Sequence, residues 1–168
     1  KKEVMPKMTT QSEPQEAPKD IVLQKACDFI AKLEGCKLTA YKCPAGVWTI
    51  GFGTTSGVKE GDQITLRKAG ELLRRDTKEF LDCVRKEAGS ICNENQLVAL
   101  TSFAFNVGKE AFRKSRLLTV IKKNTQDFTG IKSQFLRWVY ADKKPLEGLK
   151  NRRNAEFEMY KKPCILQK

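Results

Sequence analysis

The chain has 168 residues, 40% hydrophobic and 31% charged, a composition typical of one folded globular unit. No stretch approaches the roughly 18 uninterrupted apolar residues of a membrane-spanning helix, so no membrane span is expected. The net charge of +12 predicts attraction to a polyanion such as nucleic acid, anionic lipid or a bacterial envelope.

Histidine is absent and cysteine occurs six times. Without histidine, neither a Ser-His-Asp nor a Cys-His catalytic unit can form, and no G-x-S-x-G elbow or phosphate-binding Gly-Lys-Ser loop is present. The cysteines form no C-x-x-C pair, so we expect no metal site and no cofactor. The sequence does not decide between disulfides and reduced, mostly buried thiols.

The first predicted helix follows a polar arm. Residues 1–19 contain three prolines and no sustained period, which predicts a flexible N-terminal segment. Apolar residues then recur at helical spacing as far as Leu33, with Asp20 placed to cap this helix and Gly35 to end it. Glu34 falls in the last turn, where the negative end of the helix dipole opposes its ionisation.

The next segment, about residues 36–64, predicts a small antiparallel sheet. Pro44 and Gly46 mark a turn, and the apolar residues from Trp48 to Phe52 alternate as in a strand. The glycines of this segment allow another backbone, or a ligand, to approach closely.

A long helix then follows, beginning at a Thr65 cap and keeping one apolar face to about residue 86. Such a helix could join two lobes. Its predicted apolar positions are Leu66, Ala69, Leu73, Phe80 and Val84.

The remainder, about residues 88–165, predicts a helical lobe with short connections. One small sheet and at least five helices behind it give an α+β fold that is mostly helical, with residues 20–168 as one two-lobed domain. The expected boundaries are a capping pair at Asn93 and Gln96, a cap at Ser115, a helix from Asp127 to Trp138, and a last helix over residues 146–160.

Carboxylate acid/base chemistry remains available, the kind that glycosidases perform with two acidic groups across a sugar ring. Glu34 is the best-placed candidate acid. Its spacing alone is equally that of an ordinary surface residue at a helix end.

The stretch EGCKLTAYKCPAGVWTIGFGT, residues 34–54, resembles the signature of the phage-type lysozymes or endolysins of glycoside hydrolase family 24, which cleave peptidoglycan glycan strands. In that family eight residues separate the Glu of a Glu-Gly helix end from an Asp, and five more lead to a Thr. Glu34, Cys43 and Thr49 fall at those intervals. SFAFNVG, FRKSRLL, RWVYA and GLKNRRNAE follow in the order of the lambdoid endolysins, so the resemblance covers about residues 22–160.

The sequence departs from the family at two positions. Cys43 replaces the Asp that holds or activates the attacking water, and Thr54 stands where many members have His or Asp. A thiol with a pKa of about 8.5 is mostly protonated at neutral pH. Lys37 and Lys42 nearby would lower the pKa of this thiol, whereas an ionised Glu34 would raise it.

Four roles for Cys43 stay open. It positions the water, or it is a bystander while Thr49 orients the water. It forms a disulfide, with Cys36 as the nearest partner, or it attacks the sugar to give a thioglycoside, a route that usually employs a carboxylate. Loss of general-base catalysis lowers the rate by about 10²- to 10⁴-fold, so weak activity on ordinary peptidoglycan is expected. The lost charge also suggests a preference for N-deacetylated glycan, which carries ammonium groups.

The resemblance implies a substrate cleft between the lobes. Phe105, Asn106 and Ser115 match positions that touch the sugar chain, and Thr54 is placed beside them. Arg152 or Arg153 would pair with Glu34 and set its protonation. From the residues alone, Phe105 is also expected in the core, Ser115 as a helix cap and the two arginines on a solvated basic face; Trp48 and Trp138 are expected in the core.

The function implied is a muramidase that hydrolyses the β-1,4 bond between N-acetylmuramic acid and N-acetylglucosamine. The alternatives are a lytic transglycosylase, which needs only one Glu, and a glycan-binding homologue with little turnover. A nucleic-acid binder ranks lowest because no base-reading motif accompanies the charge. We expect a monomer acting on bacterial peptidoglycan after export to the periplasm or the exterior, any signal lying outside this sequence.

Overall fold

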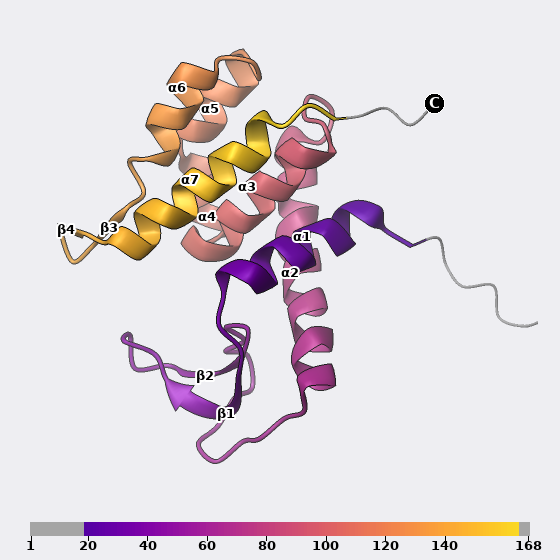
Figure 1. Cartoon of the computed structure of the whole chain (residues 1–168), viewed down its shortest axis with the longest axis vertical. Helices are drawn as coiled ribbons and strands as arrows, with labels where there is room; N and C mark the ends of the chain where they lie inside the picture. Colours follow the sequence, from indigo (N-terminus) through magenta and orange to yellow (C-terminus); the bar gives the residue numbers. More distant parts are fainter. Residues whose placement is uncertain (1–18, 165–168) are drawn as a thin grey trace, which may run out of the picture.

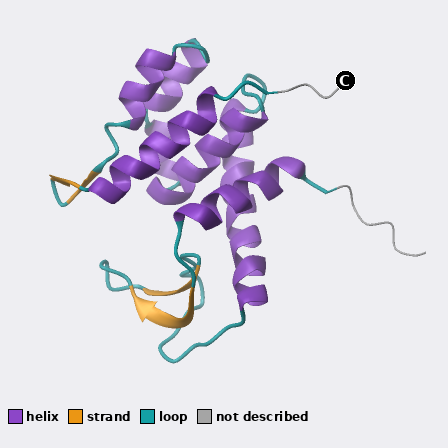
Figure 2. Cartoon of the chain, in the orientation of Figure 1, coloured by secondary structure: helices purple, strands orange, loops and turns teal. Residues whose placement is uncertain are grey.

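A computed structural model describes residues 19–164 as two lobes connected by a long helix (Figure 1). Helix α1 (Ile21–Leu33) leads into the small lobe, where β1 (Lys37–Lys42) pairs antiparallel with β2 (Trp48–Gly51). Helix α2 (Leu66–Ala88) then runs from the small lobe into the helical lobe. This is the expected α+β fold with helices in the majority (Figure 2).

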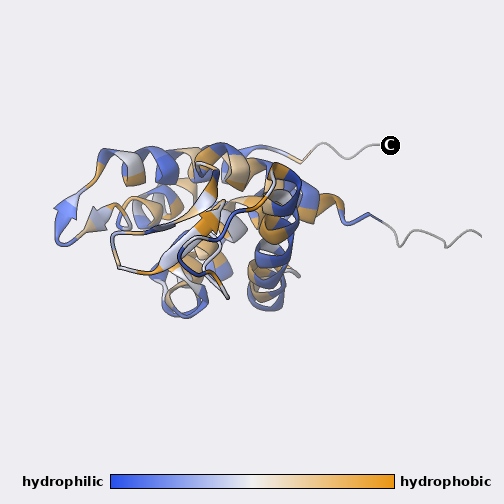
Figure 3. Ribbon diagram, turned by 90° about the horizontal axis from the view of Figure 1, so that it is seen from below, coloured by the Kyte–Doolittle hydropathy of each residue, from blue (hydrophilic) through white to orange (hydrophobic). Residues whose placement is uncertain are grey.

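The helical lobe is built around α3, which is apolar over most of its circumference because it is enclosed by other helices. The outer helices instead show hydrophobic and hydrophilic segments in alternation, as amphipathic helices do (Figure 3). The elements are α3 (Glu94–Val107), α4 (Lys109–Lys114), α5 (Arg116–Lys123), α6 (Phe128–Phe135), β3 (Tyr140–Ala141), β4 (Lys144–Pro145) and α7 (Glu147–Lys161).

The helix starts follow from the capping side chains that the sequence provides. Each capping oxygen accepts a backbone N–H of the first turn, which satisfies a donor that has no partner within the helix. All five predicted starts are confirmed: Asp20, Thr65, Ser115 and Asp127 accept from Leu23, Lys68, Leu118 and Gly130, and Asn93 forms a reciprocal capping box with Gln96.

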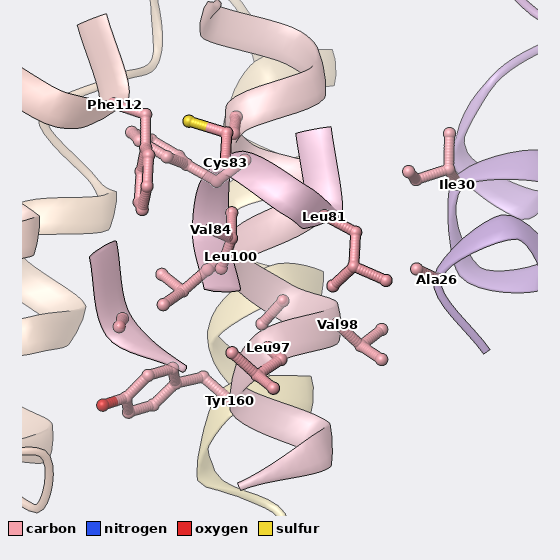
Figure 4. Close-up of a cluster of buried hydrophobic side chains, with 14 of the residues drawn as sticks. Ala26, Ile30, Leu81, Cys83, Val84, Leu97, Val98, Leu100, Phe112 and Tyr160 are labelled. Atoms are coloured by element: carbon pink, nitrogen blue, oxygen red, sulfur yellow. The ribbon is translucent and has the colours of Figure 1, made fainter. Parts of the chain in front are cut away.

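The core lies where α1, α2 and α3 meet. Ala26 and Ile30 of α1 point toward Leu81 of α2 and Val98 of α3 (Figure 4), and all four are completely buried. Burying such an aliphatic side chain stabilises the fold by about 1.5–3 kcal/mol for the larger ones. The packing fixes the direction in which α1 ends, and therefore the position of Glu34.

A second part of the core is aromatic. The ring of Phe103, on α3, meets Phe112, Phe135 and Trp138 edge to face at centroid separations of 6.4, 5.7 and 5.5 Å. These contacts hold the C-terminal half of α3 against α4 and α6.

Several local expectations were wrong. Gly35 does not have a left-handed backbone; α1 ends because Glu34 is extended, with its N–H bonded to the Ile30 carbonyl at 2.9 Å. Leu66, expected on the apolar face of α2, is 64% exposed because it is the first residue of that helix and precedes the part that packs in the core. Trp48 is only half-buried and lies outside the core, whereas Trp138 is half-buried but packs against it.

The end of α6 also differs from expectation. The helix stops at Phe135, before Trp138, and a short β3–β4 hairpin follows that was not predicted. Asp142 and Lys143 form its turn with φ values of 48° and 63°. A turn with two left-handed residues usually contains Asn-Gly or Gly-Gly, so Asp-Lys gave no turn signal.

The predicted N-terminal arm, residues 1–19, lies outside the described residues except for Lys19. Within residues 19–164, no helix combines the length and the apolar character needed to cross a membrane.

Candidate active site

Glu34 occupies the point where α1 passes into the small lobe. It is the C-cap residue of α1, and its side chain is 27% exposed. One carboxylate oxygen accepts a hydrogen bond from Nη1 of Arg152 at 2.5 Å. Glu34 is therefore held from the helical lobe while it keeps access to solvent.

Arg152 is the arginine that pairs with Glu34. Only 8% of its side chain is exposed, and its Nη2 donates to the backbone oxygen of Ser102 at 3.2 Å and to the hydroxyl at 3.3 Å. Its Nε lies 3.4 Å from a carboxylate oxygen of Glu156. These contacts fix the guanidinium between α3 and α7.

Arg153 faces the interior and does not reach Glu34. It is fully buried, donates to Oδ1 of Asn106 at 2.7 Å, and lies 5.0 Å from the ring centroid of Phe103. Its Nε lies 2.7 Å from Oε1 of Glu156. The expectation that both arginines form a solvated basic face was wrong, because each neutralises a carboxylate inside the fold.

Phe105 marks the approach of the small lobe to α3. Its half-buried ring packs on Phe80 of α2 at a centroid separation of 5.4 Å. Gly53 has φ 103°, and a Cβ atom built on it would lie 4.0 Å from the Phe105 ring. The small lobe therefore comes close to α3 at Phe105.

Three hollows lie near Phe105, Asn106 and Trp138, and the residues that line them do not include Glu34, Cys43 or Thr49. Phe105 and Asn106 are adjacent in α3 and belong to the first and second hollow respectively, while the second and third share Arg137 and Trp138. They measure about 280, 510 and 400 Å³. The walls of the first hollow include Asp76, Glu79, Phe80 and Phe105. Those of the second include Asn106, Val107, Tyr140 and Leu149, and those of the third include Lys114, Ser115, Arg116 and Gln134.

Cys43 follows β1 and is enclosed by its own turn. The backbone N–H groups of Val47 and Ala45 lower the pKa of the Cys43 thiol, against the opposing effect of burial. The sequence left two opposing effects open, and neither Glu34 nor the two lysines, Lys37 and Lys42, are among the causes of this lowering. Their ammonium groups lie over the rings of neighbouring aromatic residues of the sheet instead.

Thr49 lies next to Cys43, as the motif implied. It is buried, and its hydroxyl donates to the Val47 carbonyl at 3.0 Å. The structure therefore brings two of the predicted site residues together on the sheet.

Cys36 and Cys43 do not form a disulfide; all cysteines are free. The two residues flank β1, whose six residues separate them by about 3.3 Å each. A disulfide needs Cα atoms within about 7 Å, so this bridge is incompatible with an intact β1.

Two predicted binding residues have their hydroxyl groups engaged within the protein. Thr54 is buried and donates to Oδ2 of Asp76 at 2.7 Å, which ties the sheet to α2. Ser115 donates to the Phe112 carbonyl at 2.7 Å and accepts from the Leu118 N–H as a helix cap.

Sequence reasoning missed the residues that support the arginines. Glu156 is completely buried and accepts from Ser102 at 2.7 Å. Its spacing of four residues from Arg152 and three from Arg153 places all three on one helical face, a signal that was available in the sequence.

Known proteins agree with this architecture. The phage lysozyme family model matches residues 31–156. An endolysin of Acyrthosiphon pisum secondary endosymbiont phage 1 is 35% identical over 143 residues, covering 83% of this chain and 97% of that protein.

Solved structures of similar proteins include the muramidase domain of SpmX from Asticaccaulis excentricus, at 30% identity and a TM-score of 0.75, covering 82% of this chain and 95% of that one. The active form of the P1 phage endolysin Lyz has a TM-score of 0.71 at 28% identity, covering 82% and 83%; its secreted inactive form has 0.53 at 27%, covering 82% and 93%. The family model covers most of this chain, and the chain belongs to the phage lysozyme family.

Proposed function

We propose that this protein is a peptidoglycan hydrolase, a muramidase that cleaves the β-1,4 bond between N-acetylmuramic acid and N-acetylglucosamine. The observation that carries the proposal is the position of Glu34, a partly exposed carboxyl group at the junction of the lobes, held by a buried arginine. The names of similar proteins, endolysins and a muramidase domain, support the same activity.

In the mechanism that follows, Glu34 protonates the oxygen of the departing sugar. A general acid of this kind contributes about 10²- to 10⁴-fold. Water attacks the anomeric carbon from the opposite face, which inverts its configuration. After the proton transfer, the Arg152 guanidinium beside Glu34 balances the negative charge of the carboxylate that forms.

Cys43 and Thr49 position the attacking water in this proposal. Two features support that role: Thr49 lies close to Cys43, and backbone N–H groups of the turn lower the pKa of the Cys43 thiol. The greater similarity of the fold to the active than to the inactive form of P1 endolysin supports a catalytically competent conformation.

The three hollows provide a path for a linear polymer past Phe105, Asn106 and Trp138. The cysteine at position 43 leaves room for an altered substrate preference in this proposal, and N-deacetylated glycan is one candidate. The net charge of +12 favours binding to the anionic envelope by a monomeric enzyme outside the cytoplasm.

The decisive experiment compares Glu34→Gln with the parent on purified sacculi. We expect solubilisation to fall at least about 100-fold, with the melting temperature little changed. Glu60→Gln is the matched control, because Glu60 is exposed in the small lobe. Unchanged solubilisation by Glu34→Gln would refute the proposal.

Mass spectrometry of the parent's products tests the type of reaction. A muramidase releases reducing ends that contain the elements of water, whereas a lytic transglycosylase releases anhydro sugars. The transglycosylase alternative is favoured by the absence of a second carboxylate in the Cys43–Thr49 pair, and anhydro products would establish it.

A further inference from the structure

The cluster of charges behind Glu34 is balanced. Arg152 and Arg153 supply two positive charges, and Glu34 and Glu156 supply two negative charges, all joined by contacts of 2.5–3.4 Å. Glu156 and Arg153 have no exposed surface, and Arg152 has 8%. Water therefore does little to screen these charges from each other.

This arrangement creates a conflict for a general acid. A guanidinium in contact with a carboxyl group favours the ionised form, whereas Glu34 must hold a proton before it can give one. A second carboxylate on the same guanidinium weakens this effect, since it balances part of the positive charge. The Nε edge of Arg152 meets Glu156, while its Nη1 meets Glu34.

We propose that Glu156 is a positioning residue for catalysis: it orients the Arg152 guanidinium toward Glu34 and balances part of its charge, and so sets how strongly Arg152 acts on the Glu34 carboxyl group. This inference rests on the proposed role of Glu34 as the acid. Glu156 itself touches no substrate, because its side chain is completely buried.

Two guanidiniums surround the buried Glu156 carboxyl group. Burial raises the pKa of Glu156 overall, and the Arg153 and Arg152 guanidiniums and the Ser102 hydroxyl limit this rise. Burial also lowers the pKa of Arg153 to about 10, which leaves that side chain cationic at neutral pH. Two cations enclosed here require a buried counter-charge.

The charged surroundings of both carboxyl groups are simple within residues 19–164. Glu156 contacts two guanidiniums from its own helix, and α3 adds only the uncharged Ser102 hydroxyl. Glu34 contacts Arg152 from α7. A substitution at Glu156 therefore reaches Glu34 through Arg152.

The test is the pH profile of activity in Glu156→Gln. Gln keeps the size and an acceptor for Ser102 but removes the charge, so Arg152 favours ionised Glu34 more strongly. The alkaline limb of the pH–activity profile, where activity falls as the pH rises, should then shift to lower pH by roughly one unit. A merely structural role would lower the melting temperature and the rate without moving this limb.

Glu158→Gln is the matched control, since it makes the same change two residues away at a side chain that is 58% exposed and paired only with Lys161. Its pH limb should coincide with that of the parent. Glu156→Asp retains the charge and should restore the parental limb at a reduced rate. Coincidence of the Glu156→Gln limb with that of Glu158→Gln would overturn the inference.

A measurement on the parent keeps the inference testable if Glu156→Gln does not fold. Carbon-13 NMR of labelled Glu carboxyl groups, with Glu156 assigned by its proximity to Ser102, should show a carboxylate throughout the active pH range. A protonated Glu156 at the pH of maximum activity would refute the inference. An inactive Glu34→Gln together with a parental limb in Glu156→Gln would leave the proposed function intact and reject only the role of Glu156.

Discussion

Cys43 stands where the sequence resemblance leads us to expect an aspartate. Backbone N–H groups of its own turn lower the pKa of the Cys43 thiol, which increases the fraction of thiolate at a given pH. Cys36, at the other end of β1, is an exposed thiol without those donors and serves as an internal reference.

Alkylation by iodoacetamide should distinguish the two thiols. In Cys36→Ser, the rate of modification of Cys43 should reach half its maximum at a lower pH than the modification of Cys36 in Cys43→Ser, because the thiolate is the nucleophile. Peptide mass spectrometry across pH measures both rates. Modification of Cys43 should also abolish the hydrolysis of sacculi; full activity after complete modification would mean that Thr49 alone orients the water.

Replacing the thiol by aspartate tests the same position in the other direction. Cys43→Asp should raise the rate on fully acetylated sacculi by about 10- to 100-fold, since a carboxylate is ionised throughout the neutral range. The rate on N-deacetylated sacculi serves as the comparison. An equal gain on both substrates would show that Cys43 limits the rate without setting the preference for glycan.

Among the elements, α1 depends on an ion pair as well as on its core face. Asp20 caps the helix and accepts two hydrogen bonds from Arg85 of α2, at 2.7 and 3.0 Å. The hydrogen bonds from Arg85 lower the pKa of Asp20 to about 2, despite the opposing effect of burial. The pair joins the first turn of α1 to the last turns of α2.

Asp20→Asn should therefore destabilise the protein in a pH-dependent way. The stabilisation is complete above the unfolded-state pKa of 3.8 and disappears as the pH falls through about 2. Because a third of each side chain is exposed, we expect a loss of about 1 kcal/mol at pH 7. Urea unfolding at pH 7 and pH 2 measures it, with Asp28→Asn, on the exposed face of α1, as the control. A loss that persists at pH 2 would assign the effect to capping.

The helices were predictable because each carries local signals. Caps at Asp20, Thr65 and Asn93 and the apolar period of α2 depend on residues a few positions apart. The partners of Arg152 and Arg153 were not predictable in the same way, because Ser102 and Glu34 lie 50 and 118 residues away and are brought together only by the packing of α3 against α7. The motif resemblance supplied Glu34; it did not supply the buried Glu156 behind it.

At the scale of the whole molecule, the lobes are joined by α2 and by a few contacts across the junction. Thr54 of the sheet bonds Asp76 of α2, and Arg152 of α7 bonds Glu34 at the end of α1. The site thus lies where α1, α3, α7 and the sheet meet.

The excess of positive charge should govern binding to the envelope. The Debye length falls from about 10 Å at 0.1 M salt to about 3 Å at 1 M, so attraction between the chain and anionic sacculi should weaken over this range, whereas contacts with the sugar itself should not. Co-sedimentation of Glu34→Gln, which binds without turnover, measures this. We expect salt to release it from sacculi but to leave its binding to chitin, an uncharged N-acetylglucosamine polymer, unchanged. Equal salt sensitivity on both polymers would mean that charge does not direct the protein to the wall.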